Sequence, residues 1–342
     1  MKNKPITIAG NHILPGSYNM ISLPTPELYT QTKMGIPVHV FHGKKAGPKM
    51  FITAGIHGDE LNSIEILRRL HKQKWLKDIK GTLITIPVVN IYGFIIQSRY
   101  LPDRRDLNRS FPGSETGSLA AKLAHLLHDE IIRHCQYGID LHTGAYGRIN
   151  LPQLRVNLET PGTKQLAKAF DVPVIVDALI RDGSLREAAS EIGIPLLVYE
   201  AGEALRHNEF CVKMGVRGIG NVMSFLGMVS RPKTKKKSDL KPLITKNVHW
   251  VRAGKSGILH PVKDFTKSFA VKKNEILAYI HDPFLMNPSH KVLAPYNGVV
   301  IGYSKLPVVN EGDATFNIAS TESLQSVEAY IEELREEIIQ HY

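Results

Sequence analysis

The sequence has few cysteines and no long apolar run, and both shortages restrict the class of protein. Only Cys135 and Cys211 occur in 342 residues, and neither has a CxxC-type partner nearby. We therefore expect reduced core thiols of a cytoplasmic protein, without a disulfide framework. No stretch approaches the roughly 20 apolar residues that cross a bilayer, so we expect no membrane partner. The first residues lack an apolar core of the secretory type, and we expect no signal peptide.

The sequence has fewer acidic than basic residues, which raises the question of a nucleic-acid partner. The chain has 43 Lys and Arg against 32 Asp and Glu, a formal charge of +11. Residues 231–241 contain six basic residues and one acidic residue, so this segment alone carries +5. Because no aromatic residue is interleaved there, we predict a basic linker over 231–247 and no nucleic-acid partner, with a basic nucleic-acid binder kept as a rival hypothesis. The remaining charge, about +6, would help to attract an anionic substrate.

The pattern of apolar segments predicts two parts. Residues 1–230 contain continuously apolar strands (50–54, 81–90, 137–142, 172–176 and 195–200) and helices (61–75, 118–134, 163–170 and 208–226), after a short β-rich segment, about 1–47. This alternation predicts an α/β domain with a mixed sheet flanked by helices. Residues 248–342 predict a smaller β-rich domain ending in a helix over 323–341. We expect that helix to dock on the parent domain; a contact in a possible homo-oligomer is less favoured.

Three residues with metal-ligating side chains fall at or just after the ends of predicted strands. His57 and Glu60, three residues apart in the segment GIHGDE (55–60), follow strand 50–54, and His142 ends strand 137–142. The adjacent glycines leave room for a sharp turn and for the approach of a substrate. In open α/β sheets the ligand lies beyond the carboxyl ends of the strands, so we expect these residues to form one site. Two His and one Glu form a ligand set of catalytic zinc.

Hydrolysis at such a site also needs a general base. Glu200 ends the predicted strand 195–200 and is the candidate; Glu203, three residues later, is the alternative. A single His or Glu after a strand is most often structural, so the prediction depends on all of these residues meeting in one place.

A loop over residues 99–109 supplies candidate anion-binding groups. We assign Arg99 to stabilisation of the developing oxyanion, with Arg104 and Arg105 left open as alternatives. Asn108 and Arg109 are candidates for binding a carboxylate of the substrate bidentately.

Four segments together resemble the succinylglutamate desuccinylase/aspartoacylase family, a branch of the zinc carboxypeptidase fold that cleaves amides of N-acyl amino acids. In chain order they are GIHGDE (55–60), DLNRSFPG (106–113), DLHTG (140–144) and YEAG (199–202). The resemblance extends from about residue 35 to 230. Segments APYNGVV (294–300) and GDA (312–314) resemble the small β-domain of the same family.

This resemblance implies one Zn²⁺ per chain, held by His57, Glu60 and His142, with Glu200 as general base and the pair Asn108 and Arg109 as carboxylate clamp. The implied activity is a zinc-dependent hydrolysis of the amide bond of an N-acyl amino acid or a similar small carboxylate-bearing amide, through a zinc-activated water. A metallocarboxypeptidase acting on peptide or cell-wall-type substrates is the alternative enzyme. A metal-binding protein without catalysis is the rival from another class. Segment 294–300 also resembles lipoyl- or biotinyl-type domains, but a structural or lid role is favoured over a carrier role.

Overall fold

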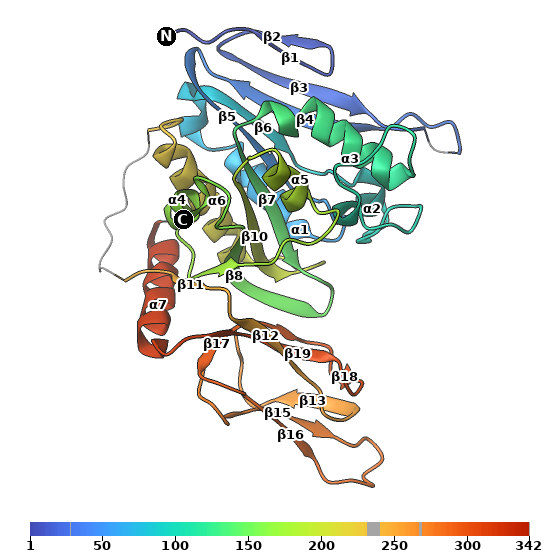
Figure 1. The fold of residues 1–342 in the computed structure, drawn as a ribbon, viewed down its shortest axis with the longest axis vertical. Coiled ribbons are helices and arrows are strands. Elements are labelled where there is room, and N and C mark those ends of the chain that lie inside the picture. Colours follow the sequence, from blue (N-terminus) through green and yellow to red (C-terminus); the bar gives the residue numbers. More distant parts are fainter. Residues whose placement is uncertain (28, 231–239, 267–268, 342) are drawn as a thin grey trace.

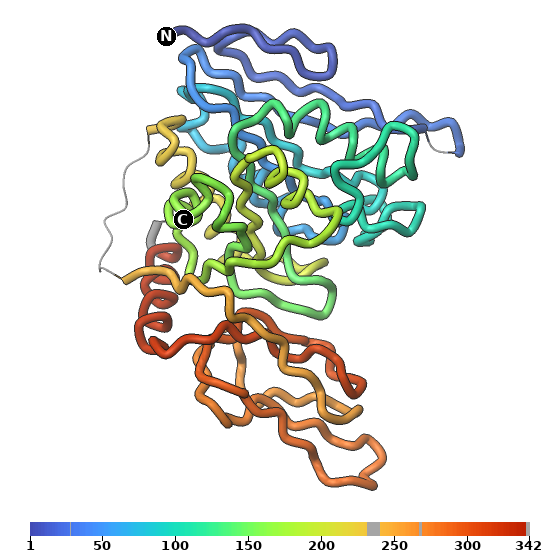
Figure 2. The backbone as a smooth tube through the Cα atoms, viewed as in Figure 1, coloured from blue at the N-terminus to red at the C-terminus, as the bar shows by residue number. Residues whose placement is uncertain are grey.

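One large mixed sheet organises the chain, as Figures 1 and 2 show in a computed structural model that describes residues 1–27, 29–230, 240–266 and 269–341. The strands are β1 (Ile6–Ile8), β2 (Asn11–Ile13), β3 (Ser17–Pro24), β4 (Gly35–His42), β5 (Lys45–Thr53), β6 (Lys80–Ile86), β7 (Tyr137–Gly144), β8 (Arg148–Val156), β9 (Val174–Asp177), β10 (Leu196–Glu203), β11 (Leu243–Thr245), β12 (Val248–Arg252), β13 (Gly257–Pro261), β14 (Ala270–Val271), β15 (Ile276–His281), β16 (His290–Leu293), β17 (Gly298–Ser304), β18 (Val308–Val309) and β19 (Ala314–Ser320).

The helices cover both faces of this sheet. They are α1 (Leu61–Leu70), α2 (Ile91–Ile95), α3 (Leu119–Glu130), α4 (Thr163–Phe170), α5 (Leu185–Glu191), α6 (Glu209–Phe225) and α7 (Leu324–His341), with 3₁₀ turns at Lys74–Asp78, Leu107–Arg109 and Ile132–His134. The predicted helix over 61–75 thus ends at Leu70 and is followed by a 3₁₀ turn. Side chains cap several helices where the sequence offers them: Ser118 accepts a hydrogen bond from the Ala121 amide and Asn208 from the Cys211 amide.

The centre of the sheet is parallel, and both ends of its main path are antiparallel. Its main path within the described residues runs β12-β19-β17-β8-β10-β7-β5-β6-β4-β3. Strands β6, β5, β7 and β10 are parallel neighbours, whereas β8 pairs antiparallel with β10. Residues 50–52 of β5 are fully buried, which explains why this strand is apolar on both faces.

Two apolar layers enclose the central strands. One contains residues of α1, α4, α6 and α7, and the other contains residues of α2, α3 and α5 together with the N-terminal strands. This arrangement, with a smaller antiparallel β-rich region at the C-terminal end, confirms the predicted fold class: an α/β mixed sheet flanked by helices and followed by a smaller β-rich part.

Helix α7 docks on the parent sheet domain. Its Tyr330 belongs to the same apolar layer as α6. The buried Arg217 of α6 donates through Nη2 to Asp171 Oδ2 at 2.6 Å and to Glu337 Oε2 of α7 at 2.7 Å. A buried guanidinium with two carboxylate partners joins α7 to the rest of the chain.

The C-terminal β-rich region continues the large sheet. Strand β17 pairs antiparallel with β8, and β19 and β12 follow it outward. A second sheet, β16-β15-β13-β18, lies beyond them (Figure 1). Most of the predicted basic linker, residues 231–239, lies outside the described residues. Its last part includes β11, which pairs parallel with β9. Among the described residues, no helix combines the length and apolarity needed to cross a membrane.

Candidate metal centre and active site

The three predicted metal ligands meet at the carboxyl ends of adjacent parallel strands. His57 and Glu60 lie in the turn between β5 and α1, and His142 lies on β7, the neighbour of β5. All three side chains are buried, and one potential ligand atom from each lies within 4.8 Å of the others.

Glu60 lies between the two imidazoles. Its Oε1 is 2.7 Å from His57 Nδ1, and its Oε2 is 2.8 Å from His142 Nδ1. The backbone amide of Thr143 donates to Oε2 over 3.1 Å. Both Nδ1 atoms therefore face the same carboxylate, and these atoms form the candidate coordination sphere.

Two further carboxylates hold the outer nitrogens of the imidazoles. His142 Nε2 is 2.7 Å from Asp140 Oδ2, and His57 Nε2 is 3.2 Å from Asp106 Oδ1. Thr53 donates to the other Asp140 oxygen at 2.7 Å. Carboxylates in this position fix the orientation of metal-ligating histidines and raise their basicity. The chemistry of the donors therefore fits a divalent metal such as Zn²⁺, with Nδ1 of each imidazole directed to it.

The carboxylates dominate the electrostatics of this cluster. Burial by itself would lower the pKa of His57 and His142, but the charges of neighbouring carboxylates outweigh it and raise both pKa values. Burial would likewise raise the pKa of Glu60, but the two imidazoles lower it far below its usual value. The site therefore holds Glu60 as a carboxylate.

Gly58 allows the turn that carries the first two ligands to pack closely. A Cβ at this position would lie 2.0 Å from the Gly93 carbonyl carbon and 2.1 Å from the Phe94 amide nitrogen. The Gly58 amide also donates to the Ser98 carbonyl over 3.0 Å. The adjacent glycines were predicted to allow a sharp turn and the approach of a substrate; at Gly58 the close neighbour is the backbone of the segment that leads to Arg99.

Glu200 lies on β10, beside the third candidate ligand. It is opposite His142 in the parallel pairing of β10 with β7, so both side chains are on the same face of the sheet. Its Oε2 accepts a hydrogen bond from Asn150 Nδ2 over 2.9 Å, and its Oε1 is 3.9 Å from Arg155 Nε.

The alternative base, Glu203, is engaged elsewhere. Its Oε1 accepts a hydrogen bond from the Gly147 amide over 3.2 Å, and its Oε2 is 3.4 Å from Lys305 Nζ. Its position favours a structural role in holding the turn between β7 and β8.

Of the three candidate oxyanion arginines, Arg99 is the one at the metal cluster. Its Nη1 is 3.3 Å from His57 Nδ1 and 3.8 Å from Glu60 Oε1. Its Nη2 donates to Asp106 Oδ2 over 2.7 Å, which fixes the guanidinium. Arg104 and Arg105 are exposed, and Arg105 Nε lies 3.9 Å from Asp103 Oδ2.

The predicted carboxylate clamp lies next to a second loop that also carries arginines. Asn108 Oδ1 accepts a hydrogen bond from the Leu185 amide over 2.9 Å, so this oxygen holds the start of α5. Arg109 is exposed, and a Cβ at Gly183 would lie 2.4 Å from its carbonyl oxygen. The loop before α5 therefore packs directly against the clamp.

Three arginines near Glu200 were not predicted from the sequence. Arg155 lies on β8, Arg181 lies in the loop before α5, and Arg186 lies on α5. Arg155 Nε and Arg186 Nη1 are buried without a hydrogen-bond partner among the described residues. Burial, followed by the charges of Arg155 and Arg181, lowers the pKa of Arg186 to about 10. Guanidinium groups so crowded together favour an anion as their neighbour.

Comparison with known proteins identifies the family. Residues 46–226 match the family model for the succinylglutamate desuccinylase/aspartoacylase catalytic domain. The chain belongs to this family. The resemblance predicted from its four sequence segments is thereby confirmed, and the matched region includes the metal cluster, Arg99, Glu200 and all of the arginines described above.

Three known proteins illustrate what this succinylglutamate desuccinylase/aspartoacylase family member is similar to. The N-alpha-acetyl-L-2,4-diaminobutyric acid deacetylase of Halomonas elongata is 28% identical over 202 residues, which cover 57% of this chain and 59% of the relative. The match therefore spans less than two thirds of that relative's length. The succinylglutamate desuccinylase/aspartoacylase of Rhodobacter sphaeroides is 25% identical, with a TM-score of 0.77 over 88% of this chain and 95% of that one. The ectoine utilization protein EutE (DoeB) of Ruegeria pomeroyi shares the fold, with a TM-score of 0.78 at 24% identity over 89% and 95% of the two chains.

Proposed function

We propose that this chain is a zinc-dependent amidohydrolase that hydrolyses the amide bond of an N-acyl amino acid or a similar small amide bearing a carboxylate. The observation that carries the proposal is the buried His57, Glu60 and His142 cluster with Glu200 beside it on the next strand. The Halomonas elongata relative is named as a deacetylase of an N-acetyl amino acid, which supports the reaction class.

His57 Nδ1, Glu60 and His142 Nδ1 would hold one Zn²⁺. When bound, the ion supplies a Lewis acid that polarises a carbonyl and lowers the pKa of a water molecule. Asp106 and Asp140 keep the imidazoles in the orientation that presents Nδ1 inward.

Glu200 and Arg99 would perform the proton transfer and the charge stabilisation. Glu200 takes a proton from the attacking water, the water oxygen bonds to the carbonyl carbon, and the carbon–nitrogen bond breaks. Glu200 then gives the proton to the leaving nitrogen, so that a carboxylic acid and an amine are released. The Arg99 guanidinium, held by Asp106, donates to the oxygen on which negative charge develops.

The arginines near Glu200 support an anionic group on the substrate. Arg109 is the predicted clamp, and Arg155, Arg181 and Arg186 add positive charge on the same side of the site. Asn108 contributes through its bond to the Leu185 amide, which holds the junction between the loop that carries Arg181 and helix α5, which carries Arg186.

A substrate panel tests the reaction class directly. The purified chain would be incubated with N-acyl amino acids that differ in acyl group and side chain, with their carboxamide counterparts, and with peptides bearing a free C-terminus. We expect amine release from the N-acyl amino acids, loss of release after chelation, and recovery with Zn²⁺. Release of C-terminal residues from peptides alone would favour the metallocarboxypeptidase, and stoichiometric zinc without hydrolysis would favour a metal-binding protein.

Replacing Arg186 with methionine is expected to weaken substrate binding without destabilising the fold. Arg186 is 8% exposed; within the part of the chain that the structure describes, its Nη1 has no hydrogen-bond partner, and its Nη2 donates to the Leu179 carbonyl. A charge-assisted hydrogen bond is worth about 1.5–3 kcal/mol, so KM for a carboxylate-bearing substrate should rise by roughly 10- to 100-fold. Replacing a buried, poorly paired charge by an apolar side chain is often neutral or stabilising, so Tm should be unchanged or higher.

Arg217 provides the matched control for this prediction. It is also a buried arginine on a helix, but its guanidinium is paired with Asp171 and Glu337. Arg217→Met leaves two carboxylates without their partner and should lower the free energy of unfolding by about 3–5 kcal/mol. An Arg186→Met variant with unchanged KM for carboxylate-bearing substrates would remove Arg186 from substrate binding.

A further inference from the structure

Asn150 on β8 holds the carboxylate of Glu200. Asn150 is 8% exposed, and its Nδ2 donates to Glu200 Oε2 over 2.9 Å. The other oxygen, Oε1, is 3.9 Å from Arg155 Nε, which is longer than a hydrogen bond. The Asn150 amide therefore determines the direction in which this carboxylate points.

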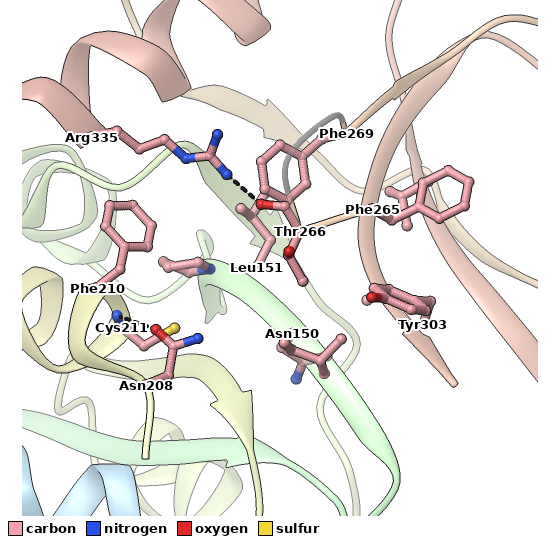
Figure 3. A pocket seen from close by; sticks show the side chains of 14 residues that line it. Asn150, Leu151, Asn208, Phe210, Cys211, Phe265, Thr266, Phe269, Tyr303 and Arg335 are labelled. Atoms are coloured by element: carbon pink, nitrogen blue, oxygen red, sulfur yellow. Dashed lines mark hydrogen bonds between the residues drawn. The ribbon is translucent and has the colours of Figure 1, made fainter. Parts of the chain in front are cut away.

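The position of Asn150 depends in turn on the C-terminal β-rich region. β8 lies between β10, which carries Glu200, and β17, and Asn150 is opposite Gly202 on one side and Gly302 on the other. A Cβ at Gly302 would lie 2.6 Å from Asn150 Oδ1, so a side chain at 302 would displace the amide. Figure 3 shows Asn150 among the residues that line a pocket, together with Tyr303 and Phe265 of the C-terminal region.

We propose that Asn150 is a positioning residue for Glu200, and that Gly302 on β17 keeps the Asn150 amide in place. The C-terminal β-rich region then contributes to catalysis from outside the matched catalytic domain, because its strand β17 sets the side-chain direction of Asn150. This inference rests on the proposed function, since it requires Glu200 to carry the proton.

The physical reason is the geometric demand on a general base. A base must lie within hydrogen-bond distance of the proton that it takes, and a displacement of about 1 Å can cost about 100-fold in rate. The Glu200 side chain has three torsions, χ1 to χ3, between the backbone and the carboxylate oxygens, and all three must be fixed. The Asn150 hydrogen bond fixes one carboxylate oxygen and leaves the other to act.

The first test replaces Asn150 with leucine, which has a similar size and no donor. We expect kcat to fall by roughly 10- to 100-fold with KM and zinc content nearly unchanged. The matched control is Gln153→Met, because Gln153 is a buried amide on the same strand, opposite Glu200 in register, but donates to the Ile301 carbonyl. A general loss of stability would affect both variants, whereas the kcat loss should be confined to Asn150→Leu.

A double-mutant cycle separates positioning of Glu200 from an independent effect. If Asn150 acts through Glu200, Asn150→Leu should cause almost no further loss of kcat in the Glu200→Gln background. If it acts independently, the two losses should multiply.

The second test leaves both residues in place and changes the neighbouring strand. Gly302→Ala is expected to lower kcat by about 10-fold by displacing the Asn150 amide. Gly298→Ala is its control on the same strand: that Cβ would lie 2.5 Å from the Ala319 carbonyl oxygen and should reduce stability without lowering kcat. Gly302→Ala also keeps the proposal testable if Asn150→Leu does not fold.

The outcomes separate this proposal from the proposed function. Wild-type kcat in Glu200→Gln would refute the role of Glu200 and, with it, the proposed mechanism. A low kcat in Glu200→Gln together with wild-type kcat in Asn150→Leu or Gly302→Ala would overturn the positioning role alone. Multiplicative losses in the double variant would also overturn it.

Discussion

Replacing Glu200 with glutamine is expected to lower kcat by roughly 100- to 10,000-fold while the metal stays bound. General acid–base catalysis by a positioned side chain contributes rate factors of this size, and glutamine cannot accept the proton from water. The glutamine amide keeps the shape of the carboxylate, and Glu200 is not among the residues of the metal cluster. Zinc content, measured by elemental analysis, should therefore equal that of the wild type, and the loss should appear in kcat more than in KM.

Glu203→Gln is the control for this prediction. Glu203 is on the same strand, but its carboxylate is engaged with the Gly147 amide and Lys305. We expect a loss of stability and a change in kcat well below that of Glu200→Gln. Full activity in Glu200→Gln, or the larger loss in Glu203→Gln, would assign the proton transfer to a different residue.

The sequence was sufficient to predict residues whose positions depend on strand ends. His57, Glu60, His142 and Glu200 all follow or end apolar runs that become β5, β7 and β10. Adjacent parallel strands bring their carboxyl ends to one edge of the sheet, so the pattern alone implied that these side chains meet. Asp140 could have been predicted in the same way, because it lies two residues before His142 on a strand and therefore on the same face.

Residues on β8 and in the loop before α5 could not be predicted by the same reasoning. The β8 sequence RINLPQLRV alternates polar and apolar residues on both sides of Pro152, but the proline shifts the phase of the alternation and is depleted in strand interiors. Asn150 and Arg155 were missed because the strand itself was missed. Arg186 lies on a helix of seven residues, too short to show a helical period. The contact of Asp106 with His57 joins residues 49 positions apart and exists only in the folded loop.

The C-terminal region shows a different limit of sequence reasoning. Short strands broken by turns predicted a small β-domain after a linker, and the many strands are present in the structure. Local sequence patterns do not predict which strand will pair with each edge strand of a sheet. The pairing of β17 with β8 joins this region to the large sheet, and it places Gly302 beside Asn150. The functional consequence of that pairing is therefore visible only in three dimensions.

Replacing His142 with alanine is expected to abolish zinc binding and with it the activity. A catalytic zinc usually has three protein ligands, and the remaining pair, His57 and Glu60, is insufficient to retain it. A ligand that binds only the folded state stabilises that state, so the Tm of the wild-type protein should fall when the metal is chelated. The Tm of His142→Ala should be the same with and without chelator.

The control for this last prediction is His42→Ala, which removes an equally buried histidine from the same sheet. His42 contacts Thr82 and the Lys4 carbonyl, and it lies outside the metal cluster. Its loss should reduce stability by the removal of buried contacts but leave one zinc per chain and the chelator-dependent Tm shift intact. Stoichiometric zinc in His142→Ala would contradict the proposed ligand set, because the metal would then have to be held by side chains other than these three.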